Sequence, residues 1–401
     1  MNASQRPRDG IRVLEVGQLL AGPFAGSMLA YYGAEVIKVE PPGSGDPLRQ
    51  WRELDENGTS WWWRSLGRNK KCITADLRNE EGRQLVGKLA RKCDVLIENF
   101  RPGVMEKWGL GPADLWEDNP GLVYARISGY GQDGPYSARP GFASVCEGVG
   151  GLRYVNGKPG EAPMRPNLSL GDTIAGLHTA LGIVMACLHR ERNPGAGGQV
   201  IDTALYEASF NLLEGVIPEY DGAGVIREPS GSTLTGIVPT NTYKCADGKF
   251  IVIGANGDSI FKRLCDTMGR SGMGIDPRLE NNAGRVRHEP EIDAAIEDWT
   301  GSVDSKTALH MLEDARVPAG PINSVADMMI DPHFIARGLF EEVDVNGKPL
   351  KIPAMVPKMS ETPGRTDWAG SEVGAFNAEV YGELLGLSET ELEDLKTRGV
   401  L

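Results

Sequence analysis

An acidic residue stands at the start of an apolar stretch near the middle of the chain, in the segment SLGDTIAGLH from Ser169 to His178. Asp172 follows a glycine and precedes a helical pattern. Aspartate is a preferred N-cap residue, because its carboxylate accepts hydrogen bonds from the first free amides of a helix. The same carboxylate can attack an electrophilic carbonyl carbon and form a covalent intermediate. The local sequence therefore leaves two roles open for Asp172, helix cap and nucleophile.

Other residue types that often carry chemistry are not arranged for it. The six cysteines include no CxxC pair, and the five histidines form neither HExxH nor HxH. We therefore expect no metal site and no redox motif. Scattered cysteines behind an N-terminus without a cleavable signal are typical of buried free thiols in a reducing compartment, so we expect a cytoplasmic protein.

The composition excludes several broad classes of protein. With 401 residues, 40% hydrophobic and 24% charged, the chain is long enough for a large core and more than one globular domain. The formal net charge of −13 disfavours general nucleic-acid binding, and no apolar stretch approaches membrane-spanning length, so we expect neither partner. A polyanionic ligand would need a local basic cluster. The first third of the chain offers one, formed by Arg49, Arg52, Arg68, Lys70, Lys71, Arg78, Arg101 and Lys107.

Strand-like and helix-like segments alternate through the first half of the chain. Residues 12–16 form a β-rich run, 24–32 a helical one and 35–39 a second strand. The alternation continues through KCITADL, EEGRQLVGKLARKC, DVLIENF and LVYARISGYG. It predicts a Rossmann-like, doubly wound α/β domain whose parallel sheet binds ligands at the carboxyl ends of its strands. A long helical pattern at 173–192 follows, with helical spacing of Leu177, Leu181, Val184 and Leu188.

A change of pattern marks a second domain. The segment NTYKCADGKFIVIGANGD predicts a β-hairpin that turns at Asp247 and Gly248 and leads through a glycine loop, 254–258, into a helix. We therefore assign residues 225–325 to a smaller α+β domain. Residues 1–224 form the large domain, which the C-terminal segment 326–401 completes.

The loop after the first predicted strand only partly matches a dinucleotide-binding fingerprint. The loop contains glycine, and an acid, Glu40, ends the next strand. However, the glycines at 17, 22 and 26 do not form GxGxxG, so NAD is a minor alternative. Lys38 suits an adenine nucleotide that carries a phosphate better than a bare ribose.

Seven segments occur in a fixed order along the chain. They are GIRVLEVGQLLAGPFAG, GAEVIKVEPPGSGD, KKCITADLRNEEGRQL, DVLIENFRPGVMEKWGL, RISGYGQDGP, the GD pair at 171 and 172, and GGQVIDTALYEAS. Together they resemble the class III coenzyme A transferases, the family of formyl-CoA transferase and carnitine CoA-transferase. The resemblance runs from Gly10 to about Glu228 and continues more weakly to the C-terminus.

This resemblance implies an interlocked homodimer, in which each chain has a Rossmann-like large domain that binds CoA and a small domain. CoA and its thioesters are then substrates, and no cofactor is permanently bound. Asp172 matches the aspartate that forms acyl anhydride and aspartyl-CoA thioester intermediates in the family, and the glycine segment 254–258 matches a mobile cover. Arg78 and Lys107 exchange the basic residue types expected at their positions. The CoA-contacting positions are matched by Gln18, Leu19, Ala21, Lys38, Arg78, Asn99, Phe100 and Lys107, with Arg139 aligned more loosely.

The resemblance also indicates a substrate class. The segments RYVNGKPGEAPMRPNLSLGD and VPTNTYKCADG resemble the branch that moves CoA from succinyl-CoA to small dicarboxylic acids such as glutarate, malate, citramalate or itaconate. A second carboxylate needs a basic partner near the acyl group, for which Arg153 and Arg165 are candidates.

Two alternative functions stay open. The related α-methylacyl-CoA racemases pair the aspartate with a histidine, but Phe142 stands at that position here, and a phenyl ring cannot remove a proton. A CoA-binding protein without catalytic activity would keep Asp172 only as a helix cap. Replacement of Asp172 by asparagine distinguishes the non-catalytic CoA-binding protein from the enzyme, because asparagine also caps helices but is not a nucleophile of this kind.

Overall fold

The computed structural model describes residue 6 and residues 10–401, and its first half builds a six-stranded parallel sheet. Neighbouring strands follow the order β3-β2-β1-β4-β5-β6, and every pair is parallel. The order reverses between β1 and β4, which is the switch point where α/β sheets bind ligands. The predicted α/β class and parallel sheet are confirmed. The strands are β1 (Arg12–Glu15), β2 (Glu35–Glu40), β3 (Lys70–Thr74), β4 (Val95–Glu98), β5 (Val123–Ser128) and β6 (Val200–Ala204).

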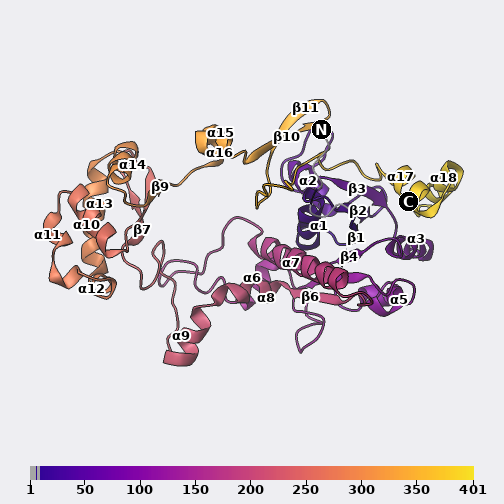
Figure 1. Ribbon diagram of the computed structural model, residues 1–401, viewed down its shortest axis with the longest axis horizontal. Coiled ribbons are helices and arrows are strands. Elements are labelled where there is room, and N and C mark those ends of the chain that lie inside the picture. Colours follow the sequence, from indigo (N-terminus) through magenta and orange to yellow (C-terminus); the bar gives the residue numbers. More distant parts are fainter. Residues whose placement is uncertain (1–5, 7–9) are drawn as a thin grey trace. The chain divides into compact units, whose positions relative to one another are not determined.

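Helices cover both faces of this sheet (Figure 1). On one face, Val13, Val95 and Ile97 pack against α1 (Ala21–Tyr31) and α7 (Leu170–Arg192). On the other face, Leu14 and Leu96 pack with residues of α3 (Glu80–Ala90), α17 (Asn377–Leu385) and α18 (Glu389–Thr397). Alternate residues of β1 and β4 thus enter two different cores, which explains why Val13 and Leu14, and Val95, Leu96 and Ile97, are consecutive apolar residues.

Shorter elements complete this first unit. The hairpin of β10 (Phe340–Val345) and β11 (Lys348–Pro353) is antiparallel. The short helices are η1 (Pro47–Gln50), α2 (Trp61–Leu66), α4 (Val104–Lys107), α5 (Pro112–Trp116), α6 (Ala143–Val149), α8 (Leu205–Phe210) and η2 (Asn211–Leu213).

The second unit has its own sheet and core. The strands β7 (Thr240–Lys244), β8 (Phe250–Gly254) and β9 (Ala319–Pro321) are antiparallel, and the predicted hairpin turn at Asp247 and Gly248 is confirmed. The glycine loop 254–258 joins β8 to α10, and the buried Arg285 binds it through Asn256 O (2.5 Å) and Asp258 Oδ1 (2.8 Å). The helices are α9 (Val216–Ala223), α10 (Asp258–Thr267), α11 (Ser271–Gly274), η3 (Pro277–Leu279), α12 (Asn282–Arg287), α13 (Glu289–Ser302), α14 (Ser305–Asp314), α15 (Val325–Ile330) and α16 (Pro332–Ala336), the last of which crosses the boundary between the units.

The boundaries of the two units differ from the expected domain limits. The first unit runs to Leu152 and includes Pro166–Glu214 and Ile335–Leu401, whereas the second contains Arg153–Arg165 and Gly215–Phe334. The expected small domain, 225–325, lies within the second unit. The sequence does not indicate that residues 153–165 belong to the second unit, because a short segment without a helix or strand has no periodic pattern.

Helix α7 corrects two expectations. It begins at Leu170 rather than at 173, so Asp172 lies in its first turn and not at its N-cap. It is also long and apolar enough, by length and composition alone, to span a membrane, against the expectation that no stretch approaches that length. Its small residues instead pack on α1 and the sheet. At Gly176 a Cβ would lie 2.7 Å from the carbonyl oxygen of Ala21, so only glycine permits this close approach of the two helices.

Candidate active site

Asp172 is half-buried at the third position of α7, where the helix dipole favours a negative charge. The N-cap is Ser169, and the amide of Gly171 donates to Glu147 Oε1 at 3.1 Å. Glu147 is buried on α6, and a Cβ at residue 171 would lie 3.1 Å from its Cγ. The glycine before Asp172 therefore allows Glu147 to approach the start of the helix. The Gly171 amide thus donates its hydrogen bond to the carboxylate of Glu147 and not to that of Asp172.

Asp172 lines a cavity of about 230 Å³ at the carboxyl ends of β1, β4 and β5. Its walls come from segments that are far apart in the sequence: the loop after β1, the loop after β4, the end of β5 and the loop before α6. This place is the switch point of the sheet, where a ligand site is expected. The structure brings seven of the predicted site residues into this one cavity: Gln18, Leu19, Ala21, Asn99, Phe100, Arg139 and Asp172.

A second cavity, of about 360 Å³, lies at the carboxyl ends of the neighbouring strands β2 and β3. Gln18 and Phe100 line both cavities, so the two adjoin there. Arg78 lines the second cavity, with 86% of its side chain exposed, and its guanidinium binds the carboxylate of Asp76 at 2.9 Å. This hydrogen bond lowers the pKa of Asp76. The pair of cavities can hold an elongated ligand with one end at Asp172 and an anionic end at Arg78.

Asn99 holds the backbone of the loop after β1. Its Oδ1 accepts from the amide of Gln18 and its Nδ2 donates to the carbonyl of Gln18, both at 2.7 Å. A Cβ at Gly17 would lie 2.7 Å from Asn99 Oδ1, so the pairing requires glycine at that position. Asn99 therefore lines the cavity while both ends of its amide are engaged by the protein.

Glu98 and Arg126 support the next residue, Phe100. Glu98 Oε2 accepts from the amide of Phe100, and Oε1 accepts from Arg126 Nε, both at 2.7 Å. Burial raises the pKa of Glu98 to about 7, although the nearby guanidinium opposes the shift. The Phe100 ring packs edge-on against Trp108, with ring centroids 5.1 Å apart.

Two predicted residues lie outside both cavities. Lys38 is fully buried, with its Nζ 2.8 Å from Asp46 Oδ2 and 3.2 Å from Glu15 Oε1, and it donates to the carbonyl of Gly17. In this position its ammonium group lies beneath the loop and cannot contact a ligand in either cavity. Lys107 lines a third cavity, beside α3 and α5. Neither placement supports the predicted contact with CoA.

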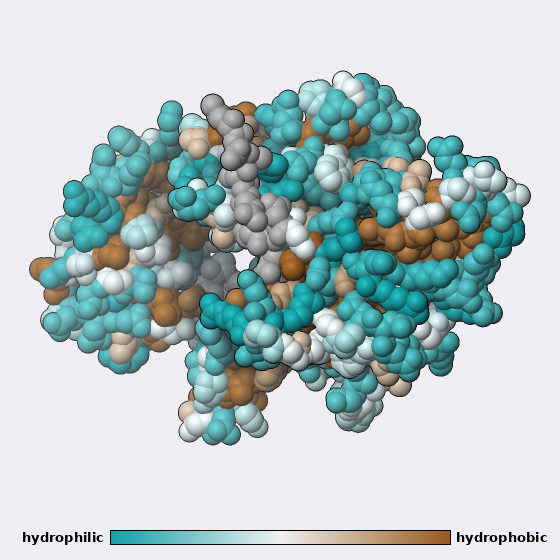
Figure 2. All heavy atoms as spheres, turned by 45° about the vertical axis from the view of Figure 1, so that its right-hand side comes forward, coloured by the Kyte–Doolittle hydropathy of each residue, from teal (hydrophilic) through white to brown (hydrophobic). Residues whose placement is uncertain are grey.

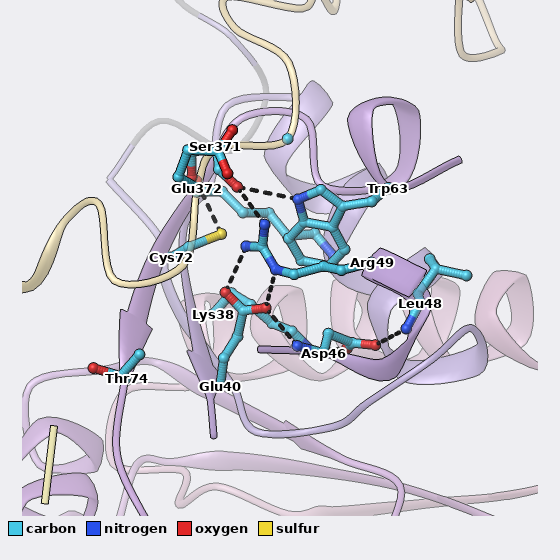
Figure 3. A network of polar contacts seen from close by, with 12 residues as sticks. Lys38, Glu40, Asp46, Leu48, Arg49, Trp63, Cys72, Thr74, Ser371 and Glu372 are labelled. Atoms are coloured by element: carbon cyan, nitrogen blue, oxygen red, sulfur yellow. Dashed lines mark hydrogen bonds and ion pairs between the residues drawn. The ribbon is translucent and has the colours of Figure 1, made fainter. Parts of the chain in front are cut away.

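The contacts of Glu40 argue against the NAD alternative. Its Oε1 accepts from Arg49 Nε and from the amide of Asp46, both at 2.8 Å, and its Oε2 binds Arg49 Nη2 at 2.7 Å (Figure 3). A ribose-binding acid needs a carboxylate that faces the ligand. Glu40 lines the second cavity, but it is buried and both of its carboxylate oxygens are already bound by Arg49 and the amide of Asp46.

The cavity around Asp172 also bears on the racemase alternative. Phe142 lines it and is 73% exposed, and no histidine is among the described residues of its walls. Cys146 lies close enough for the charge of Asp172 to affect it, and its Sγ donates to Gly129 O at 3.3 Å. Burial, with a smaller contribution from Asp172, raises the pKa of this thiol to about 11, so it stays protonated at neutral pH.

Sequence reasoning missed two residues of this site. Glu147 has no local signal, because its partner Gly171 is 24 residues away. Arg101 stood out only as one member of a basic cluster, yet its exposed side chain lines the Asp172 cavity together with Arg139. The proposed anion-binding residues Arg153 and Arg165 belong to the second unit.

Comparison with known proteins agrees with this geometry. A model of CoA-transferase family III matches residues 9–375. The succinyl-CoA–D-citramalate CoA-transferase of Chloroflexus aurantiacus is 45% identical over 397 residues, which cover 99% of this chain and 98% of that protein. The succinate–glutarate CoA-transferase of Agrobacterium fabrum is 35% identical, with 96% and 97% covered.

The fold is shared as well. The crystal structure of a CAIB/BAIF family protein from Brucella suis, 34% identical, has a TM-score of 0.83 and covers 95% of this chain and 100% of that one. The resemblance found from the sequence is confirmed: the chain belongs to CoA-transferase family III and is a CoA-transferase.

Proposed function

We propose that this enzyme transfers CoA from succinyl-CoA to a small dicarboxylic acid through covalent intermediates on Asp172. One observation carries the proposal: the Asp172 carboxylate, at the start of α7, lines the same cavity as Gln18, Asn99 and Phe100 at the switch point of the sheet. The relatives named for succinyl-CoA with citramalate and for glutarate support the choice of donor and acceptor.

The adjoining cavities support one orientation of CoA. Its phosphorylated nucleotide end lies in the cavity with Arg78, whose exposed guanidinium can bind phosphate. The uncharged pantetheine arm passes Gln18 and Phe100, which line both cavities. The thioester then reaches Asp172. CoA is a substrate in this scheme, and its binding needs neither Lys38 nor Lys107.

The reaction balances without a proton donor or an external water. The Asp172 carboxylate attacks the succinyl thioester carbonyl, and the CoA thiolate leaves, which yields a mixed anhydride. The thiolate then attacks the Asp172 acyl carbon and releases succinate, which leaves an aspartyl-CoA thioester. The acceptor carboxylate attacks that thioester and expels the thiolate. Attack of the thiolate on the acceptor acyl carbon finally yields the new thioester and restores Asp172.

Two guanidinium groups support a dicarboxylic acceptor. CoA has phosphates only at its nucleotide end, so the anionic group expected near Asp172 is the distal carboxylate of the acyl chain. Arg101 and Arg139 both line that cavity and both are exposed. Arginine binds carboxylates through paired, charge-assisted hydrogen bonds. We assign the distal carboxylate to these two residues rather than to Arg153 and Arg165.

Intact-protein mass spectrometry after mixing with succinyl-CoA tests the mechanism. We expect a CoA adduct on the peptide that contains Asp172, and no adduct in Asp172→Asn. The matched control is Asp202→Asn, which removes an exposed aspartate of the same unit that lines neither cavity. An adduct that persists in Asp172→Asn would refute the assignment. Bound CoA without any adduct would favour racemase-like chemistry or a binding protein without catalysis.

We further propose an interlocked homodimer in the cytoplasm. Helix α7 leaves Leu177, Leu181, Met185 and Leu188 between 41% and 56% exposed, and hydrophobic residues gather in clusters on the face seen in Figure 2. Apolar surface of this kind is typical of an interface between subunits. All six cysteines are free and buried, which fits a reducing compartment.

Light scattering after size-exclusion chromatography tests the dimer. The wild type is expected at twice the mass of the chain, and the double variant Leu181→Asp/Met185→Asp at the monomer mass or aggregated. Ile275→Asp alters a more exposed apolar residue of the second unit and serves as the control. A monomeric wild type would refute the proposal.

A further inference from the structure

We infer that Asp46 is a positioning residue, which holds the backbone of Leu19 and so sets one wall of the Asp172 cavity. The inference rests on the proposed function, because it assumes that the chemistry takes place at Asp172. Asp46 is buried in the loop between β2 and η1 and lines neither cavity. It therefore acts through the loop after β1 and not on the substrate.

Leu19 has an unusual backbone. Its φ is +64°, in the left-handed region that is disfavoured for residues other than glycine, asparagine and aspartate. The amide of Leu19 donates to both carboxylate oxygens of Asp46, each at 3.1 Å. On the other side, Asn99 binds the amide and the carbonyl of Gln18. The loop is thus held between an asparagine and an aspartate.

A chain of four buried charges continues from Asp46 beneath the loop. Lys38 Nζ lies 2.8 Å from Asp46 and 3.2 Å from Glu15, and Lys70 Nζ lies 2.8 Å from Glu15. All four side chains are fully buried, and the two positive charges balance the two negative ones. Lys38 also donates to Gly17 O, and Lys70 to Pro23 O at 2.7 Å. The two lysines therefore bind main-chain carbonyls on both sides of Leu19.

Asp46 is itself held from outside the loop. Its amide donates to Glu40, which binds Arg49 through two hydrogen bonds (Figure 3). Arg49 in turn donates to Ser371 O at 2.8 Å and lies over the Trp63 ring, 4.0 Å from the ring centroid. The backbone of Asp46 is thus held by contacts that lie outside the loop after β1.

The conformation of Leu19 affects the position of the cavity wall relative to the Asp172 carboxylate. Gln18, Leu19, Leu20 and Ala21 line the same cavity as Asp172, and the carbonyl oxygen of Ala21 lies close to Gly176 of α7. If the Leu19 backbone returns to a common conformation, this wall moves relative to the carboxylate. Misplacement by about 1 Å can slow an enzyme about 100-fold. We therefore expect loss of the Asp46 clamp to slow formation of the adduct more than it weakens CoA binding.

Two variants of Leu19 test the backbone directly. Leu19→Asn places a residue that accepts the left-handed conformation, whereas Leu19→Val places a β-branched residue that resists it. Valine is closer to leucine in hydrophobicity, so loss of side-chain packing alone predicts that Leu19→Asn is the slower variant. The inference predicts the reverse, with adduct formation in Leu19→Val slower by about 10-fold or more. If Leu19→Asn is as slow as Leu19→Val or slower, the inference is wrong.

The second comparison uses two buried aspartates of the same unit. Asp46→Asn weakens the clamp, and Asp55→Asn disturbs a pair of the same type, in which Asp55 binds Arg64 at 2.7 Å and lines neither cavity. The rate of adduct formation, the CoA Kd and the thermal midpoint are measured for both. We expect a similar drop in midpoint, with a slow rate in Asp46→Asn only. Equal rates in the two variants would overturn the inference.

Adduct formation in the wild type distinguishes failure of the proposed mechanism from failure of the role inferred for Asp46 and Leu19. If the wild type forms no adduct on Asp172, the proposed mechanism fails. If it forms the adduct and the variants show the opposite order, only the role of Asp46 and Leu19 fails. Should Asp46→Asn not fold, the Leu19 pair still decides, because both of those variants leave the four buried charges intact.

Discussion

Gly176→Ala tests whether the contact of α1 with α7 positions Asp172. A Cβ at this site would lie 2.7 Å from Ala21 O, a backbone atom that cannot rotate away. Alanine improves helix propensity by about 1 kcal/mol over glycine. Overpacking of a close contact costs about 1–3 kcal/mol. We therefore expect a net loss of up to about 2 kcal/mol in the free energy of unfolding.

The matched control is Gly148→Ala on α6, in the same unit. Nothing lies within 4 Å of a Cβ there, so only the propensity gain remains and the variant should be more stable by up to about 1 kcal/mol. Chemical denaturation gives both values. Because Asp172 lies one turn before Gly176, and Ala21 lines the cavity, Gly176→Ala should also form the adduct about 10- to 100-fold more slowly. A Gly176→Ala variant as stable and as fast as Gly148→Ala would refute the reasoning.

Further predictions concern specificity and pH. Arg101→Ala and Arg139→Ala should each lower kcat/KM for glutarate by about 10- to 100-fold and leave a monocarboxylate such as butyrate little changed, because a charge-assisted hydrogen bond contributes about 1.5–3 kcal/mol. Arg78→Ala, in the other cavity, should affect both acids equally, and a uniform loss in all three variants would contradict the assignment. Because burial raises the pKa of Glu98 from about 4.5 to about 7, the folded state binds the extra proton, and stability should fall as pH rises through that window. Glu98→Gln should lack this slope in unfolding experiments between pH 4.5 and 7, and an unchanged slope would show that another group titrates.

Local patterns predicted the elements and the order in which they follow one another. The alternation of strands and helices is visible because each element buries a periodic set of residues, as Leu85 and Leu89 do on α3. The helix that carries Asp172 has such a pattern too, although it begins three residues before the predicted start at 173. The spacing of Leu177, Leu181 and Leu188 predicted a helix, but these residues lie on the exposed side of α7, while the small residues of the helix face the core.

The sequence by itself determined the α/β class, the family and the aspartate expected to react, because periodicity and motifs are properties of neighbouring residues. Only the tertiary structure decided what each polar side chain does. Lys38 has the positive charge that a phosphate-binding residue needs, but it is buried beside Glu15 and Asp46, which neutralise it there. Asn99 binds Gln18 across 81 residues, and Arg101 joins the Asp172 cavity. A hydrogen bond or an ion pair depends on distance in space, and the fold alone sets that distance.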